Sequence, residues 1–369
     1  MGYINNWLLL VWMVVGGAFL FRAFPPRREL VDGVAVERWG AAAAILLVLP
    51  YIILAGVRSD GIADTGSYRW RFLAMPTQLG EWGDTLEKVT KDPGFTVVSL
   101  ALKFLLGNRD VLYFMVIAAF QLVVLALLYR RYSCNYWLSI FIFVASTDYI
   151  SWCTNGMRQF LAVTIILAGT KFMLERRWAP LVVLILLAST IHATALMMLP
   201  VVWMIQGQAW NRKMMVTLVC SVLALVAVDQ FTQMLSVVLE DTQYTTVVSD
   251  WQSMNDDGTS PIRVLVYAMP TILSLVGLRS IRYVNDPVIN LAANASIVST
   301  ALYMVSMVTS GIYIGRLPIY VSLYATGILL PWELKFLFEE LSGKLATMAA
   351  VVLYTAFFYY QMHGWGLLS

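Results

Sequence analysis

The chain has little charge and few histidine or cysteine residues, and each shortage excludes a class of protein. Only 13% of its 369 residues are Asp, Glu, Lys or Arg, whereas about a quarter are charged in a soluble domain. Its two histidines and three cysteines show neither metal-ligand spacing nor a disulfide framework. No long Lys or Arg run and no common nucleotide-binding or hydrolase motif occurs. We therefore expect no metal, no cofactor and no nucleic-acid partner.

Long apolar runs are what the chain has instead. Hydrophobic residues make up 60% of it, and its mean hydropathy is +0.73. A helix of about 20 apolar residues spans a bilayer, and these runs lack the alternation of outer-membrane strands. The sequence therefore predicts an all-α polytopic membrane protein, a single integral membrane domain over 1–369. The predicted spans, twelve in number, lie at roughly 4–21, 40–57, 111–129, 135–152, 158–174, 179–191, 194–206, 214–230, 263–278, 287–310, 317–331 and 345–362.

The distribution of charge predicts which side each loop occupies. The first apolar run is followed, rather than preceded, by Arg22, Arg27 and Arg28, and it lacks a small-residue cleavage site. We expect a retained helix with its N-terminus outside and, after twelve spans, a C-terminus outside as well. The predicted inner loops and the adjoining helix ends then hold 15 of the 25 Lys and Arg but only 8 of the 22 Asp and Glu. That asymmetry agrees with the positive-inside rule.

Two predicted outer segments are longer than simple connections. The first, 58–110, contains an apolar stretch at 94–107 that is short and carries Lys103, so we expect an interfacial or re-entrant helix there. The second is 231–262, where Asp256 and Asp257 are ordinary turn residues rather than a metal site. Long loops in a protein with short ones are usually functional.

Polar residues gather at the predicted outer ends of the spans. In RSDGIADTGSY (58–68), Asp60 and Asp64 are four residues apart and would share one face of a helix, where one carboxylate could act as a general base. The structural alternative is a solvated helix end. Arg58 supplies a cation beside them. In GIYIGRLPIY (311–320), Arg316 supplies another at the same predicted level, or else contacts lipid headgroups.

Two further groups lie at the same predicted face. In NGMRQ (155–159), Arg158 would be a fixed cation at a helix N-terminus, able to bind an anion through its guanidinium fork. The alternative is an N-capping Asn155 with an arginine that reaches the interface. His192 lies where the short segments 179–191 and 194–206 meet. It is either a satisfied structural residue or a group that accepts a proton or orients a hydroxyl.

These motifs, in this order and spacing, resemble the EpsG family, a branch of the Wzy-type polysaccharide polymerases. The resemblance rests on RxDGxxDTxxY from residue 58, DPGF from 92, NxxRQ from 155, HATA from 192 and GRxPxY from 315. Together they cover about residues 58–320. In that family Glu more often precedes the proline of DPGF, so we assign Asp92 no catalytic role.

The resemblance implies a GT-C-like glycosyltransferase in a bacterial cytoplasmic (inner) membrane, with short or broken helices and a site facing the periplasm or exterior. Donor and acceptor would be polyprenyl-diphosphate-linked oligosaccharides, the membrane lipid would surround them, and a chain-length regulator is a further candidate partner. Among the motif residues, the expected catalytic ones are Asp64, Arg158, His192 and Arg316. Those expected to bind substrate are Arg58, Asp60, Tyr68, Asn155, Gln159 and Tyr320.

Four other functions fit a similar architecture. An O-antigen ligase, or a transferase that uses a polyprenyl-phosphate sugar, would need similar cations but would add one unit rather than a polymer. A membrane acyltransferase could also centre on a histidine at membrane level. A transporter or flippase for lipid-linked glycans would carry charges along a path to both faces, whereas the predicted charges lie at one level. We therefore expect an enzyme.

Overall fold

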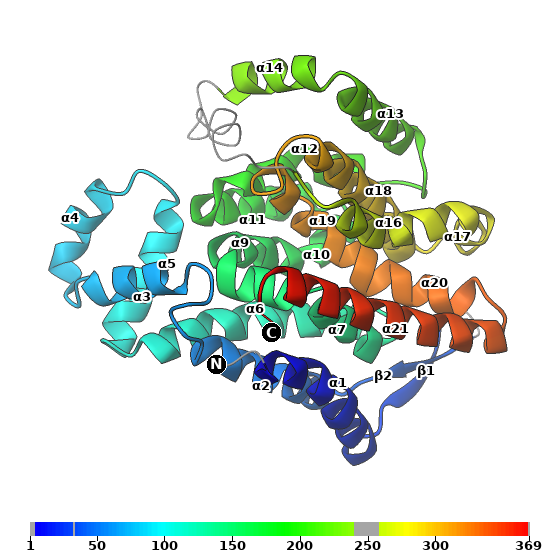
Figure 1. Ribbon diagram of the computed structural model, residues 1–369, viewed down its shortest axis with the longest axis horizontal. Coiled ribbons are helices and arrows are strands. Elements are labelled where there is room, and N and C mark those ends of the chain that lie inside the picture. Colours follow the sequence, from blue (N-terminus) through cyan, green and yellow to red (C-terminus); the bar gives the residue numbers. More distant parts are fainter. Residues whose placement is uncertain (1–3, 32–33, 240–257, 368–369) are drawn as a thin grey trace. The chain divides into compact units, whose positions relative to one another are not determined.

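The computed structural model describes residues 4–31, 34–239 and 258–367 (Figure 1). Helices form nearly all the regular structure in these ranges, and the one sheet found there is a two-stranded hairpin. The chain divides into two compact units: unit 1 comprises Met1–Leu196 with Glu340–Ser369, and unit 2 comprises Met197–Glu339. Most of the predicted outer loop 231–262, including Asp256 and Asp257, lies outside the described residues.

Unit 1 is organised around α6, which packs against α2, α7 and α9. Gly56 allows the contact with α2, because a Cβ there would lie 2.1 Å from Cγ of Met115 in α6. The elements of unit 1 are, in chain order, α1 (Ile4–Ala23), β1 (Arg27–Val31), β2 (Val34–Arg38), α2 (Ala41–Gly56), α3 (Thr65–Ala74), the 3-10 turn η1 (Leu79–Glu81), α4 (Trp82–Glu87), α5 (Pro93–Leu106), α6 (Asp110–Tyr132), α7 (Tyr136–Ala145), α8 (Asp148–Ile150), the π-helical turn η2 (Ser151–Asn155), α9 (Met157–Ala168), α10 (Thr170–Leu174), α11 (Trp178–Ile191), the 3-10 turn η3 (Ala193–Met197), which ends at the boundary, and α21 (Glu340–Gly364).

Unit 2 is organised around α18, which packs against α13, α16 and α19. Small buried residues such as Ala292, Ala293 and Ala295 let neighbouring helices approach α18 closely. The elements of unit 2 are α12 (Met198–Met204), α13 (Arg212–Val226), α14 (Val228–Leu239), α16 (Pro261–Val276), α17 (Leu278–Val284), α18 (Pro287–Met307), the 3-10 turn η4 (Ile314–Arg316), α19 (Ile319–Tyr324), the π-helical turn η5 (Ala325–Leu329) and α20 (Leu330–Phe336).

Each of the predicted spans coincides with helical structure. Among the described residues, five helices are long and apolar enough to cross a membrane, or up to seven segments if each of two bent helix pairs counts as one span. Six further apolar helices are 10–17 residues long. The chain is therefore a membrane-embedded helical protein, while the number of twelve spans, their orientation and the GT-C-like arrangement stay predictions.

The predicted span 135–152 is not a single helix. α7 ends at Ala145, Thr147 takes a left-handed φ of 68°, and the chain continues through α8 into η2. The N–H of Gly156 donates to the carbonyl of Ser151 at 2.8 Å, the five-residue step of a π turn. Such turns are rare and are frequent at functional sites. This one comes directly before α9, the helix that carries Arg158.

The segment 22–39, which joins the first two predicted spans and is predicted to lie on the inner side, contains a hairpin. Its strands pair antiparallel from Arg27 with Arg38 to Val31 with Val34. The predicted outer loop 58–110 is also more ordered than a loop, since α3, α4 and α5 occupy much of it (Figure 1). α5 coincides with the apolar stretch expected at 94–107 and begins at Pro93, a residue whose fixed φ suits the first helical position.

Candidate functional site

Side chains from three elements of unit 1 meet around Arg158, in the first turn of α9. Its Nε donates to the hydroxyl of Tyr68 at 3.3 Å, and its Nη1 donates to Oδ2 of Asp92 at 3.0 Å. The guanidinium carbon lies 5.9 Å from the centroid of the Tyr68 ring. The Arg158 side chain nevertheless stays 33% exposed, and its Nη2 makes no hydrogen bond within the described ranges. This cation is thus fixed in direction and open on one side.

Asp92 links Arg158 to the turn at His192, where α11 ends. Its Oδ1 accepts a hydrogen bond from the backbone N–H of Ala193 at 3.4 Å, while Oδ2 accepts from Arg158. Ala193 follows His192, where α11 ends, and His192 Nδ1 lies 2.7 Å from Oγ1 of Thr194. Burial raises the pKa of the Asp92 carboxyl, and the charge of Arg158 opposes this effect. The Asp92 carboxylate therefore binds two groups that lie 66 and 101 residues after it in the sequence.

The DPGF segment makes this link possible by bringing α5 close to α11. Asp92 takes a left-handed φ of 54°, and Pro93 starts α5 directly after it. A Cβ at Gly94 would lie 2.2 Å from Oγ1 and 2.9 Å from the carbonyl carbon of Thr190, near the end of α11. Only a residue without a side chain fits at this contact.

Arg58, expected to bind substrate, is enclosed in the protein. Its side chain is only 2% exposed, its Nη1 donates to the carbonyls of Ala55 and Cys153, and its Nε donates to Thr65. Its guanidinium carbon lies 4.0 Å from the centroid of the Phe114 ring. Burial lowers the pKa of Arg58 to about 10, so the group stays charged at neutral pH. These contacts support a structural role for Arg58.

The two candidate carboxylates after α2 have different surroundings. Asp60 is exposed and pairs with Arg69 of α3, which also donates to Asp110 at 2.5 Å and to the carbonyl of Arg58 at 3.1 Å. Asp64 is exposed and holds the N-cap position of α3 without a side-chain capping bond. It lies within electrostatic range of Arg158. Of these two carboxylates, Asp64 is the one that interacts electrostatically with Arg158, and its role at that site stays a prediction.

Asn155 and Gln159 flank Arg158 in different ways. Asn155 is half-buried at the end of η2, and Gly156, not Asn155, holds the N-cap position of α9. The structural alternative of an N-capping Asn155 is therefore wrong. Gln159 is buried in α9.

The other two candidate residues, Arg316 and Tyr320, belong to unit 2. Arg316 is half-buried in η4, and Tyr320 is buried in α19. In that unit the loop before Arg316 packs against Gly258 and Thr259: a Cβ at Gly315 would lie 2.5 Å from Oγ1 of Thr259. Their membership of the Arg158 site stays a prediction.

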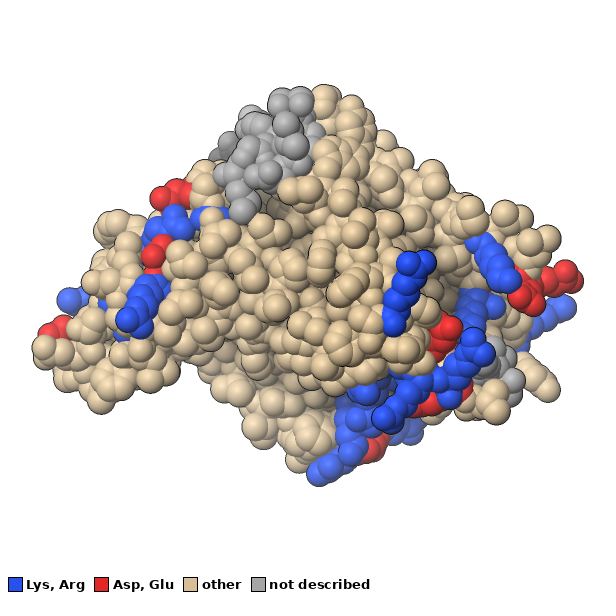
Figure 2. All heavy atoms as spheres, turned by 90° about the horizontal axis from the view of Figure 1, so that it is seen from below, with Lys and Arg blue, Asp and Glu red and all other residues tan. Residues whose placement is uncertain are grey.

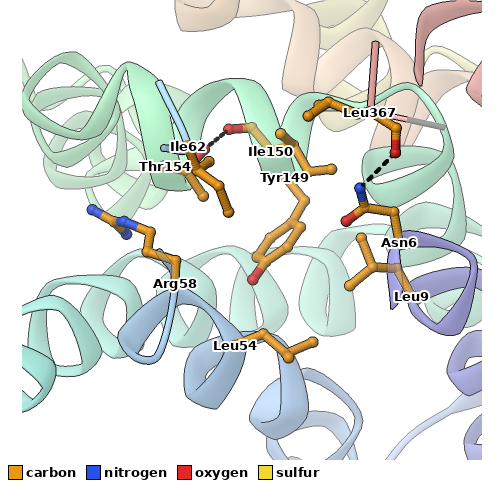
Figure 3. A pocket seen from close by; sticks show the side chains of 9 residues that line it. All are labelled: Asn6, Leu9, Leu54, Arg58, Ile62, Tyr149, Ile150, Thr154 and Leu367. Atoms are coloured by element: carbon orange, nitrogen blue, oxygen red, sulfur yellow. Dashed lines mark hydrogen bonds between the residues drawn. The ribbon is translucent and has the colours of Figure 1, made fainter. Parts of the chain in front are cut away.

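A small cavity of about 60 Å³ adjoins Arg58 within unit 1 (Figure 3). Its walls are mostly aliphatic, with Tyr149 pointing between Arg58 and Leu54, and Asn6 donates to the carbonyl of Leu367 at 3.2 Å across one end. Few polar side chains line this cavity, so we place no substrate there.

A family model for the EpsG family matches residues 42–366, which is most of the chain. The chain belongs to the EpsG family. The resemblance inferred from the motifs is thereby confirmed, and the family supports a polysaccharide-polymerase-type role in general. The comparison with curated proteins found no match, and neither did the comparison with solved structures.

Within this EpsG-family chain, the sequence does not predict the contacts of two charged residues, Asp92 at the Arg158 site and Arg69 beside Asp60. Asp92 was assigned no catalytic role, although its left-handed position before Pro93 places it between Arg158 and Ala193. Arg69 was not singled out, yet it pairs with Asp60 and Asp110. A DPG sequence directly before an apolar run was the available signal for Asp92, since it marks a tight helix start.

No group of three or more His, Cys, Asp or Glu side chains that could hold a metal occurs in the described ranges.

Proposed function

We propose that this EpsG-family protein is a glycosyltransferase that polymerises lipid-linked oligosaccharide repeats. It would transfer a glycan from a polyprenyl diphosphate carrier to a hydroxyl of a second lipid-linked repeat, at the outer face of a bacterial cytoplasmic membrane. The observation that carries the proposal is the Arg158 site: a cation held by Asp92 and Tyr68, open on one side, next to Asp64 and the His192 turn.

Arg158 would stabilise the leaving diphosphate. The bond between the anomeric carbon and the diphosphate oxygen breaks, so negative charge grows on that oxygen in the transition state. A guanidinium already oriented by Asp92 and Tyr68 needs no reorganisation to meet this charge. Losing a preorganised contact of this kind costs a factor of about 10²–10³ in rate. The free Nη2 offers donors toward the open side.

Asp64 or His192 would take the proton of the attacking hydroxyl. Asp64 is exposed and not used in a cap, so its carboxylate is available to a bound sugar. The contact between His192 Nδ1 and Thr194 fixes the imidazole ring, and if Nδ1 donates, Nε2 accepts. General base catalysis contributes a factor of about 10²–10⁴. Arg58, which has no open side, would support the fold instead.

The test is a deletion strain complemented with variants at matched expression. We expect Arg158→Ala and Asp64→Asn each to abolish long chains while single lipid-linked repeats accumulate. Arg71→Ala and Asp84→Asn are the controls, because both residues are exposed in the same 58–110 segment; long chains should persist. Full-length polymer from both site variants would refute the site.

The size of the product separates the proposed polymerase from its nearest alternatives. A ladder of chain lengths that needs this protein supports polymerisation. A single added unit would indicate a ligase or a monosaccharide transferase instead. Repeats that accumulate on the inner leaflet alone would indicate a transporter.

A further inference from the structure

The hairpin between α1 and α2 lies at a membrane surface. α1 is a candidate span that exposes Val11, Val14, Val15 and Phe19 along its length, as a helix facing hydrocarbon does. β1 begins four residues after α1 ends, and α2, an apolar helix, begins three residues after β2 ends. The hairpin therefore lies where the chain leaves and re-enters the apolar layer.

The hairpin is docked on the end of a third apolar helix. Nη1 of Arg38, in β2, donates to the carbonyls of Arg130, Arg131 and Ser133 at 3.2, 2.8 and 3.1 Å. Arg130 and Arg131 lie in the last turn of α6 and Ser133 is its C-cap residue, so these carbonyls have no partners within the helix, and a cation there also matches the helix dipole. In return, Nε of Arg130 donates to the carbonyl of Trp39 at 2.7 Å. The hairpin thus has a fixed orientation at the end of α6.

The two faces of the hairpin differ in character. Strand alternation places Val36 and Arg38 on one face and Arg28 and Leu30 on the other. Val36 is 1% exposed, whereas Leu30 is 79% exposed. Arg27 and Arg28 are exposed as well. In this register Glu37 stands opposite Arg28, so their charges balance on the outward face, and Arg27 pairs with Arg38 on the other face. The exposed positive charge of this region therefore comes from Arg27 and Arg28 of β1 together, rather than from one face.

Exposed aromatic residues extend this surface toward the hydrocarbon. Phe21 and Phe24, at the end of α1, are both exposed, as is Arg22 between them. Figure 2 shows one side of the molecule, where most of the surface is uncharged and Lys and Arg side chains gather in a few places. Arginine beside exposed Phe and Leu is the composition of a segment that lies in a lipid headgroup layer.

We propose that the exposed arginines of β1, Arg27 and Arg28, bind anionic lipid headgroups. Arg27 and Arg28 contact the headgroup phosphates, and Leu30 enters the boundary between headgroups and acyl chains. Guanidinium groups suit this partner because they bind phosphate oxygens through two parallel hydrogen bonds. The function of the hairpin is independent of the transfer reaction at Arg158.

The experiment measures lipid retained by the purified full-length chain. Protein in detergent is titrated with dioleoyl-phosphatidylglycerol or with dioleoyl-phosphatidylcholine, and bound lipid is counted by native mass spectrometry. We expect phosphatidylglycerol to bind more tightly than phosphatidylcholine. Arg27→Gln with Arg28→Gln should lower the affinity for phosphatidylglycerol by about 30-fold, given the attraction of two cations to an anionic surface. High salt should weaken the wild-type binding.

Two further variants keep the outcome unambiguous. Arg71→Gln with Lys88→Gln removes the same charge from exposed residues of the 58–110 segment, and phosphatidylglycerol binding should be retained. Leu30→Ser should weaken binding of both lipids with no change in thermal unfolding, because Leu30 is exposed. Equal affinity for the two lipids, equal loss in the control pair, or a second copy of the chain bound in place of lipid would overturn the proposal.

Discussion

Arg58 and Arg158 are both part of the motifs that identify the family, yet their surroundings in unit 1 are nearly opposite. Arg58 is enclosed and donates mainly to backbone carbonyls and a hydroxyl. Arg158 is one-third exposed and is held by a carboxylate and a phenol. A buried cation that donates to backbone carbonyls has its hydrogen bonds taken up by the surrounding protein. A carboxylate that orients an exposed cation leaves part of its donor set for a ligand.

The largest expected effect tests the structural side of this comparison. Arg58→Ala removes donors to Ala55, Cys153 and Thr65 and leaves buried carbonyls unpaired. We expect a loss of about 3–5 kcal/mol in the free energy of unfolding. Arg158→Ala should cost only about 1–2 kcal/mol, because its side chain is partly exposed. Thermal unfolding of both variants in detergent gives the comparison, and equal losses would contradict it.

The next effect concerns the carboxylate that distinguishes the two arginines. Asp92→Asn keeps an acceptor for Ala193 but removes the charge that orients Arg158. We expect polymerisation to fall about 10–100-fold, the loss typical of a group that orients a functional residue, with little change in thermal unfolding. The measurement is chain formation in membranes at matched expression. Asp84→Asn is the matched control, since Asp84 is an exposed carboxylate of the same 58–110 segment. Wild-type chain formation in Asp92→Asn would exclude a positioning role.

A smaller effect is expected at the contact that brings Asp92 into place. Gly94→Ala puts a methyl group 2.2 Å from Oγ1 of Thr190, so α5 must move away from α11. We expect a loss of about 1–3 kcal/mol, as is usual for overpacking, and a weakened Asp92 link. Adding Thr190→Ala should restore part of the loss, since the backbone carbon at 2.9 Å remains. Gly80→Ala is the control, because a Cβ there meets open space. No loss in Gly94→Ala would show that α5 can shift freely.

The smallest effect is a pH dependence with opposite signs for activity and stability. Burial raises the pKa of Asp92 above its ordinary 3.8, against the charges of Arg158 and Lys91. Protonation as pH falls through that raised pKa breaks the ion pair with Arg158, so activity should drop. Folding should not weaken through Asp92, because the cost of ionising it is present only above this window. Activity and unfolding profiles of wild type and Asp92→Asn check this. An acid limb of the same shape in both would contradict it.

How much of the fold and of the site the sequence predicts depends on how far apart in the sequence the interacting residues lie. Apolar runs predicted α6 and α18 to within a few residues, since a helix is a local pattern. The motifs also predicted Arg158 and Asp64 as neighbours. The pairing of Asp92 with Arg158 could not be predicted, because it depends on how α5 packs against α11.

Two local features were also missed, for different reasons. Runs of strand-forming residues on either side of Asp32-Gly33 in the sequence are a hairpin signal; charge alone drew attention to this region. η2 leaves no such signal, since nothing in residues 151–155 marks a π turn over an α-helical one. The enclosure of Arg58 follows from that turn, because its Nη1 donates to the carbonyl of Cys153 inside η2.

The π-helical turn has a consequence for how the site tolerates insertions and deletions. A helix turns by about 100° for each residue, so one residue more or fewer in η2 would rotate the start of α9 by about that angle. Deleting one residue between Ser151 and Asn155 would swing Arg158 away from Asp92 and Tyr68 without altering a single side chain of the site. The direction in which the Arg158 guanidinium points is therefore set by the number of residues in η2.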